Sequence, residues 1–304
     1  MSSDRPPLRS LLFVPGTRTE WLAKAAAAGA DAAILDLEDA VPQAGKAIAR
    51  ARVAEAVAGA TGDLALLVRI NPLDGWAAAE DLRAIAHARL AGVVLPKVAD
   101  EGDVRLADRL LSWCEREHGL PQGHIALVPL LESAAALRAA YDIGRAVPRI
   151  AYLGAVTGKG GDVERAVGYR WSAEGAETLA LRSRVLLDVR AAGAPCPIAG
   201  LWTNIADLEG LRAFAEQNRS LGYEGMMAIH PSHVPVINEV FSPTPEELAR
   251  YARMIAAVEE AQRHGAGAIT FEGEMVDEAM AARARTALQR SDTYGNNPET
   301  FGTS

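Results

Sequence analysis

Cysteine, basic residues and long hydrophobic runs are all scarce in this chain of 304 residues. The two cysteines, Cys114 and Cys196, are far apart and match no metal-ligand spacing, so we expect reduced thiols of a cytosolic protein. No apolar run is long enough for a signal peptide or a membrane span. These absences predict a soluble, cytoplasmic protein that contacts no membrane.

Basic residues are also outnumbered, with 31 Lys and Arg against 39 Asp and Glu and a formal net charge of −8. Lys and Arg are spread along the chain, which argues against a nucleic acid or an anionic membrane as partner. Hydrophobic residues make up 49% of the chain, enough for a large core. The length exceeds the roughly 250 residues of a typical (β/α)8 barrel and leaves room for an appendix.

Eight short apolar segments predict β-strands. They are continuous apolar runs, as is typical of parallel strands that are covered on both faces. Between them lie amphipathic segments that predict helices, for example over residues 20–28, 45–58, 104–117 and 174–192. No dinucleotide fingerprint follows the first strand, so the alternation favours a closed (β/α)8 TIM barrel over an open doubly wound sheet. The predicted strands are residues 10–14, 32–35, 64–70, 92–96, 125–131, 149–153, 198–202 and 225–229.

The pattern changes after Phe241. Thr244 and Glu247 have the spacing of a capping box and predict the start of a helix over residues 245–261. A Gly-rich break and a second predicted helix over residues 276–290 follow. Residues 1–241 are therefore the expected catalytic barrel. Residues 242–304 are too few for an independent catalytic domain and are the expected helical lid or oligomerisation arm.

Charged residues stand where several of the predicted strands stop. They are Glu38 and Asp39, Arg69, Glu132 and Asp162. The carboxyl ends of the strands of a parallel barrel open onto one face, so we expect these side chains to lie near one another. Packing alone does not explain repeated charges at strand ends. The sequence therefore predicts a polar, metal-binding pocket at this face.

Short motifs occur in order between residues 9 and 290. They are LLFVPGTR, DLEDAVP, VRIN, GVVLPKV, PLLES, GGDVERAVG, AIHP, EVFSPTPEE and EGEMVDE. As an ordered set they resemble the citrate lyase β-subunit family, which includes malyl-CoA and citramalyl-CoA lyases. The resemblance implies a (β/α)8 barrel, a homo-oligomer (trimer or hexamer) and a bound Mg²⁺. The implied reaction cleaves or forms the bond between an acyl-CoA α-carbon and a keto acid.

Glu132 and Asp162 match the metal ligands of that family. Mg²⁺ takes oxygen ligands and keeps several waters, so one or two carboxylates and substrate oxygens suffice to bind it. Each residue also has a structural alternative. In that alternative, Glu132 is an acid near a helix N-terminus, where the helix dipole stabilises its charge, and Asp162 caps a helix after a glycine-rich turn.

Arg69 is expected to bind the keto-acid carboxylate through two donors or to stabilise enolate charge. The alternative is a structural ion pair with Glu38 or Asp39. These two acids are expected to orient Arg69 and the waters of the metal. Lys97 could also be a nucleophile that forms a Schiff base with the substrate. The family uses none, so Lys97 is expected to support substrate binding electrostatically.

The loop GAVTGKGGD resembles a phosphate cradle but lacks the Walker A spacing. We expect its glycines, Gly161 among them, to let the backbone approach the substrate closely. The loop is longer than in many family members, which leaves the identity of the substrate open. Ala199 and Met226–Met227 also depart from the family, where an acid and a lysine are common.

Asp277 resembles the family residue that exchanges a proton with the acyl-CoA methyl carbon; the alternative is an ordinary acid at a helix start. The sequence thus predicts a Mg²⁺-dependent lyase. Its substrate would be a malyl-, citramalyl- or citryl-type acyl-CoA, and its products an acyl-CoA and a 2-keto acid. The alternatives are a malyl-CoA-type thioesterase, a non-catalytic or carrier-dependent citrate lyase β subunit, and a pyruvate-dependent metal aldolase.

Overall fold

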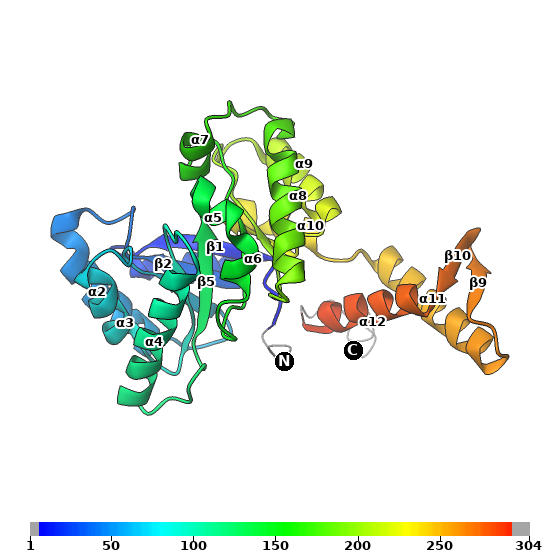
Figure 1. Cartoon of the computed structure of the whole chain (residues 1–304), viewed down its shortest axis with the longest axis horizontal. Coiled ribbons are helices and arrows are strands. Elements are labelled where there is room, and N and C mark those ends of the chain that lie inside the picture. The colour runs from blue at the N-terminus through cyan, green and yellow to red at the C-terminus, as the bar shows by residue number, and fades with distance from the viewer. Residues whose placement is uncertain (1–5, 294–304) are drawn as a thin grey trace. The chain divides into compact units, whose positions relative to one another are not determined.

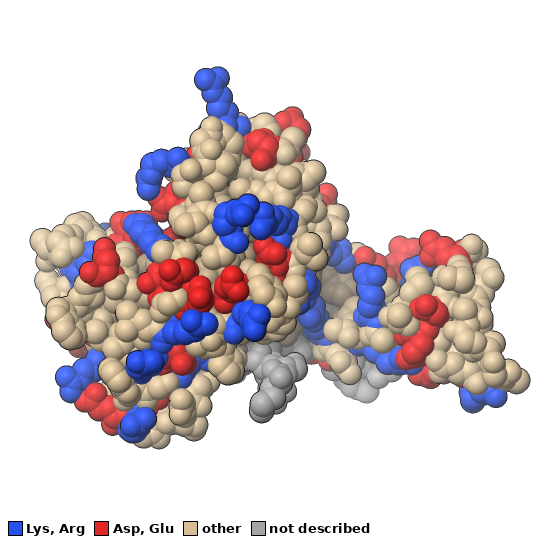
Figure 2. Space-filling view, viewed as in Figure 1, with Lys and Arg blue, Asp and Glu red and all other residues tan. Residues whose placement is uncertain are grey.

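The computed structural model describes residues 6–293, which fall into two compact units that divide between Phe241 and Ser242 (Figure 1). Within the described part of the chain, no helix is both long enough and apolar enough to cross a membrane. Figure 2 shows acidic and basic side chains interspersed over one face, as expected from charges spread along the sequence.

The first unit contains a sheet of eight parallel strands in the order β6-β5-β4-β3-β2-β1-β8-β7. Leu153 and Pro197 form a parallel bridge between the two edges, and the amide of Ile198 donates to the Leu153 carbonyl over 3.2 Å. The sheet is therefore nearly closed, which confirms the predicted barrel. The strands are β1 (Ser10–Pro15), β2 (Ala32–Asp36), β3 (Ala65–Arg69), β4 (Leu90–Leu95), β5 (Ala126–Leu131), β6 (Gly154–Ala155), β7 (Ile198–Ala199) and β8 (Gly225–Ala228).

Helices connect the strands and cover them, as the predicted alternation requires (Figure 1). In α4, the Asp100 side chain accepts the Gly102 amide at the N-terminus, and Val104, Ala107 and Leu111 are buried at helical spacing. The helices of this unit are α1 (Leu22–Ala27), α2 (Lys46–Ala58), α3 (Trp76–Ile85), α4 (Glu101–Glu117), α5 (Ala134–Arg138), α6 (Ala140–Gly144), α7 (Asp162–Val167), α8 (Ala176–Ala191), α9 (Leu208–Leu221) and α10 (His233–Phe241). Short 3-10 turns, Thr19–Trp21 and Gln43–Gly45, precede α1 and α2.

Two apolar clusters account for the continuous apolar runs. One joins alternate strand residues to the helices, and the other joins the remaining strand residues, such as Leu11, Ile34 and Leu67, to one another. Strand side chains alternate between the two faces of a sheet, so the second cluster fills the barrel interior. Apolar packing on both faces leaves the polar side chains to the strand ends.

The sixth and seventh strands differ from their prediction. Residues 149–153 were expected to form a strand, but β6 is Gly154–Ala155 and only Ile150 bridges to β5 before it. The Arg149 carbonyl still accepts the Leu127 amide of β5 over 3.0 Å, and the Arg149 side chain forms a buried ion pair with Glu115 at 2.8 Å. β7 ends at Ala199, because a Cβ on Gly200 would lie 2.1 Å from the Thr157 carbonyl oxygen. Close contact between these two loops therefore shortens both strands.

The second unit consists of α11 (Pro245–Arg263), an antiparallel hairpin of β9 (Ala268–Phe271) and β10 (Glu274–Asp277), and α12 (Glu278–Thr293). The predicted capping box is confirmed, with Thr244 and Glu247 bonded in both directions. The helix predicted over residues 276–290 is wrong at its start. Val276 pairs with Ile269 in the hairpin and is fully buried, so the Gly-rich segment contains β9 and is not merely a break between helices.

Candidate active site

A buried ion pair links the carboxyl ends of β2 and β3. Asp36 and Arg69 are register partners in the sheet, and Nε and Nη2 of Arg69 each donate to a carboxylate oxygen of Asp36 over 2.7 Å. This two-point contact fixes the plane of the guanidinium. Asp36 was not among the predicted site residues. The signal that could have found it was an acid inside an otherwise apolar, buried strand.

The same guanidinium also contacts the acids that follow β2. Its Nη1 lies 3.1 Å from Glu38 and 3.7 Å from Asp39. Burial acts to lower the pKa of Arg69, but the hydrogen bond and charge of Asp36 raise it further, so the side chain stays protonated. Asp36 occupies the Nε–Nη2 edge of the guanidinium, so a substrate would have to approach Arg69 from another side. Only the outer hydrogens of Nη1 and Nη2 remain for a ligand.

Lys97 joins this network from the end of β4. Its ammonium forms a salt bridge with Glu38 and a second contact with Asp39 at 3.4 Å. The hydrogen bond with Glu38 raises the pKa of Lys97, partly offset by burial. A Schiff-base lysine needs the opposite shift, so these contacts favour the supporting role. Lys97 also has a left-handed backbone, with φ of 52°, a strained conformation for a residue other than glycine.

Glu132 follows β5 and is 9% exposed. One of its oxygens accepts the backbone N–H of Lys97 over 3.0 Å. Burial, helped by the charges of Asp162 and Glu38, raises the pKa of Glu132 to about 7, although the Lys97 N–H and the charge of Arg69 act against it. A carboxylate in this setting gains from binding either a proton or a cation.

Asp162 is the first residue of α7 and forms a salt bridge with Arg165. Gly161, not Asp162, occupies the N-cap position, so the capping alternative for Asp162 is wrong. The φ of Gly161, −83°, is open to any residue, and it is Gly160 that has the positive φ of 73°. Nothing in its backbone conformation therefore requires glycine at position 161.

The donor set suits Mg²⁺ only in part. No group of three or more His, Cys, Asp or Glu residues that could hold a metal ion occurs within residues 6–293. Burial raises the pKa of Glu132 and the charge of Asp162 adds to that effect, so a divalent cation held by the two carboxylates would stabilise the ionised form of Glu132. Mg²⁺ accepts such a sparse set, because waters and substrate oxygens complete its coordination.

A cavity of about 410 Å³ opens at the Arg69 network. Phe13 forms one wall, with the Arg69 guanidinium 5.0 Å from its ring centroid, and Leu201 after β7 and Ile229 after β8 form others. Five strands thus contribute to it from their carboxyl ends. The described lining residues are Phe13, Pro15, Asp36, Asp39, Ala40, Arg69, Leu201 and Ile229, so Lys97, Glu132 and Asp162 do not line it directly.

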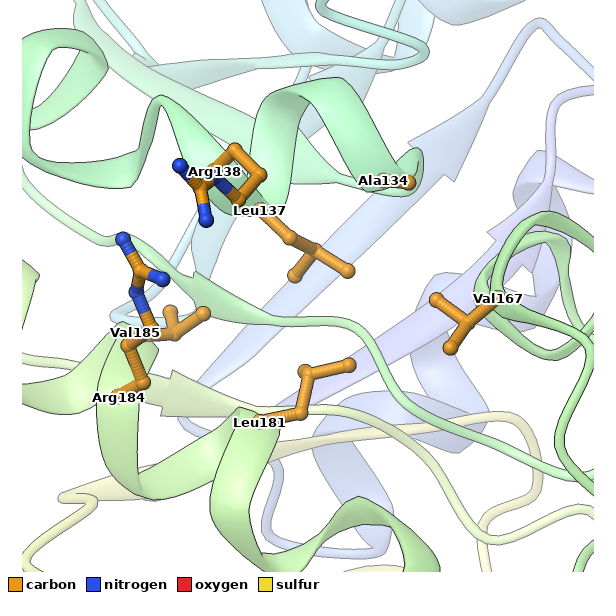
Figure 3. Close-up of a pocket in the computed structure, with 7 residues that line it drawn as sticks. All are labelled: Ala134, Leu137, Arg138, Val167, Leu181, Arg184 and Val185. Carbon is orange, nitrogen blue, oxygen red and sulfur yellow. The ribbon is translucent and has the colours of Figure 1, made fainter.

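A different cavity, of about 240 Å³, lies among α5, α7 and α8 (Figure 3). Figure 3 shows Arg138, Arg184 and Val185 on one side of it and Val167 on the other, with Leu137 and Leu181 between. Apart from the two arginines its lining is apolar, and it includes no carboxylate, so it cannot hold a hard metal ion.

Asp277 belongs to the second unit. It ends β10, and its carboxylate accepts the Met280 amide over 3.1 Å at the start of α12. Asp277 therefore acts as an N-cap within its own unit, which is the structural alternative. Its role in proton transfer stays a prediction.

Comparison with known proteins relates this geometry to named relatives. The chain is 37% identical to a citrate lyase subunit beta-like protein of Deinococcus radiodurans, over 94% of this chain and 98% of the relative. It is 33% identical to a (3S)-malyl-CoA thioesterase of Cereibacter sphaeroides, over 96% and 97% of the two chains. It is 34% identical to an L-malyl-CoA/beta-methylmalyl-CoA lyase of the same species, over 94% and 95%.

A solved structure gives the same assignment. The protein CitE of Mycobacterium tuberculosis, in complex with magnesium, acetoacetate and coenzyme A, is 31% identical and superposes with a TM-score of 0.71, covering 94% of this chain and 98% of that one. These relatives confirm the resemblance inferred from the ordered motifs. The HpcH/HpaI aldolase/citrate lyase model matches residues 9–231, and the chain therefore belongs to this family.

Proposed function

We propose that this protein is a Mg²⁺-dependent carbon–carbon lyase acting on a malyl-, citramalyl- or citryl-type acyl-CoA. The observation that carries the proposal is the continuous charged network at the strand ends, from Asp36 through Arg69, Glu38 and Lys97 to Glu132. Its products would be an acyl-CoA and a 2-keto acid. The magnesium, acetoacetate and coenzyme A held by the M. tuberculosis relative support this class of ligands.

Glu132 and Asp162 would hold the ion. When bound, Mg²⁺ supplies Lewis-acid stabilisation of oxygen charge. Lys97 serves this site through its backbone, because its N–H fixes one oxygen of Glu132 and leaves the other oxygen for a ligand. The strained conformation of Lys97 holds that N–H toward Glu132 and supports this positioning role.

Cleavage breaks the bond between the thioester α-carbon and the carbon that bears the hydroxyl. The hydroxyl gives its proton to solvent and becomes the keto-acid carbonyl, and the bonding electrons pass to the thioester fragment as an enolate. Arg69 donates hydrogen bonds from its outer edge to the oxygen on which charge develops, and Asp36 holds it in place. Its raised pKa keeps the guanidinium charged throughout the reaction.

The enolate must then receive a proton at carbon. Asp277 of the second unit is our candidate donor, as its family motif implies. The second unit would act as a lid in a homo-oligomer, so that proton transfer follows closure over the acyl-CoA. Exclusion of water protects the enolate and the thioester.

Thioester hydrolysis is the second candidate, because the malyl-CoA thioesterase and the malyl-CoA lyase are almost equally similar to this chain. Incubation with a panel of hydroxyacyl-CoA thioesters, with keto acid and free thiol measured separately, tests both functions. Keto acid without thiol indicates the lyase, and thiol without keto acid indicates the thioesterase. If neither keto acid nor free thiol forms, both functions are overturned and the subunit or aldolase alternatives are favoured.

A matched pair of variants tests the site in the same assay. Glu132→Ala should abolish whichever activity is found, because it removes a proposed metal ligand. Glu216→Ala removes an exposed acid on the outer helix α9 and should leave the activity unchanged. Equal activity in both variants would remove Glu132 from the site.

A further inference from the structure

The cavity among α5, α7 and α8 is separate from the candidate active site (Figure 3). Its volume is about 240 Å³, and none of the described residues that line it belongs to the Arg69 network. Ala134 in its wall comes two residues after Glu132, and Val167 ends the helix that Asp162 begins. The cavity therefore adjoins the segments that carry the proposed metal ligands, but neither of these two carboxylates lines it.

Most of the wall of this cavity is apolar. Leu137 and Val185 are buried in the barrel core, and Leu181 packs against them. Val167, by contrast, is 47% exposed, although its side chain faces this apolar space. An apolar ligand would remove the exposed surface of these side chains from water, which favours binding.

Two arginines form the polar end of the cavity. Figure 3 shows the guanidinium groups of Arg138 and Arg184 at the same end, opposite Val167. They come from different helices, α5 and α8. Since no carboxylate occurs among the described lining residues, two like charges face one space with no counter-charge inside it. An anion bound between them would be attracted by both.

The neighbours of these arginines leave their donors available. The side chain of Arg138 forms no hydrogen bond or ion pair within the described part of the chain. Arg184 has an ion-pair partner in Asp188, but their 3.6 Å separation is longer than a hydrogen bond. Two positive charges and one negative charge leave a net charge of +1, which a single carboxylate neutralises. The planar guanidinium fork suits a carboxylate in shape as well.

The volume limits the length of the apolar part. A cavity of about 240 Å³ has the volume of about eight waters, since each water takes up about 30 Å³ in the liquid. A methylene group is close to a water in size, so a chain of about six to eight carbons fills this space.

We propose that this cavity binds an unbranched monocarboxylate of about six to eight carbons. Its chain would lie along Leu137, Leu181 and Val185, and its carboxylate between Arg138 and Arg184. The inference goes beyond the proposed function and does not depend on it, because no residue of the lyase mechanism lines the cavity.

The test measures binding of octanoate to the full chain by calorimetry, without Mg²⁺ or acyl-CoA. Each methylene removed from octanoate should weaken binding by ~4-fold, as the loss of buried apolar surface predicts. 1-Octanol has a chain of the same length without the charge. It should bind ~10-fold more weakly, because it makes no charge-assisted hydrogen bonds with the arginines.

Variants locate the site. Arg138→Met and Arg184→Met should each weaken octanoate binding by ~10-fold and leave the affinity for 1-octanol unchanged. Val167→Trp should abolish binding of both ligands, because the larger side chain fills the cavity. Arg109→Met removes an exposed arginine of the outer helix α4 and is the matched control, with both affinities unchanged.

Three results would overturn the proposal. The first is no octanoate binding at ~10 mM, or the same affinity in wild type and Arg138→Met. The second is tighter binding of octyl phosphate than of octanoate, which would exclude a monocarboxylate as the preferred ligand. The third is a changed oligomeric state in Val167→Trp with no octanoate binding to the wild type, which would assign the groove to a second copy of the chain. Lyase activity is measured separately and stands or falls on its own assay.

Discussion

Replacement of Glu132 by glutamine removes the buried charge with little change in shape. The amide oxygen of glutamine can still accept the Lys97 N–H, which Glu132 accepts over 3.0 Å. The side chain is 9% exposed, so solvent screens the lost charge only weakly. The substitution therefore isolates the cost of ionising this carboxyl inside the folded protein.

The raised pKa sets the size and the sign of the effect. Burial, with the charge of Asp162, raises the pKa of Glu132 from 4.5 to about 7 in the folded protein. The folded chain then binds more protons than the unfolded chain between these values, so stability falls as the pH rises from 4.5 to about 7. At 1.36 kcal/mol per pH unit, the loss above that range is about 3 kcal/mol.

The expected result is a stabilised variant. In the presence of a chelator at pH 8, Glu132→Gln should unfold at a temperature several degrees above the wild type, since about 3 kcal/mol corresponds to roughly 5 °C for a chain of this size. The difference should shrink toward zero at pH 4.5. Thermal unfolding measured across this pH range checks the prediction, with Glu216→Gln on the outer helix α9 as the control.

Addition of Mg²⁺ should reverse the order at pH 8. The ion binds the ionised carboxylate, so it should raise the unfolding temperature of the wild type and not that of Glu132→Gln. A variant that is less stable than the wild type in chelator at pH 8 would refute the buried-charge argument. An equal Mg²⁺ shift in both proteins would refute the metal assignment.

Arg69→Lys should lower turnover by at least ~10²-fold, as loss of an oxyanion donor does, and destabilise the protein by ~3 kcal/mol because Asp36 stays buried without its two-point partner; near-normal kinetics would leave Arg69 a structural role. Asp277→Asn should keep the cap on α12 and the unfolding temperature but lose activity. Mixing Asp277→Asn with Glu132→Ala then tests whether two subunits share one active site. Recovered activity shows a site built from two subunits, and no recovery despite subunit exchange excludes such a shared site. Borohydride reduction with a keto acid should leave Lys97 unmodified by mass spectrometry, because its hydrogen bond with Glu38 raises its pKa; an adduct would restore the Schiff-base alternative.

The barrel could be predicted because its signal is local. Each strand is a continuous apolar run, which predicts a strand without reference to distant residues. The capping box of Thr244 and Glu247 likewise needs only four consecutive residues. The grouping of Glu38, Arg69, Lys97 and Glu132 followed from strand ends that share one face, and the structure does connect these side chains. Whether they perform the proposed chemistry stays a prediction.

Other features could not be predicted, because they depend on contacts between distant segments. Residues 149–153 are as apolar as a strand, but their pairing with β5 is interrupted between Ile150 and Gly154, and Leu153 instead bridges to Pro197. The hairpin of the second unit was missed for a similar reason. Val276 fits a helix or a strand by type, and its pairing with Ile269 selects the strand.

The sequence by itself determined the order of strands and helices, the family and the set of charged residues at the strand ends, because apolar patterning and motif order are properties of the chain. The tertiary structure decided how those charges are used. Parallel register placed Asp36 beside Arg69, where it occupies the Nε–Nη2 edge of the guanidinium. Burial raised the pKa of Glu132, and glycine at positions 154 and 200 let the segments around β6 and β7 pack closely on one another. Desolvation and hydrogen-bond partners depend on residues far apart in the chain, and only folding brings those together.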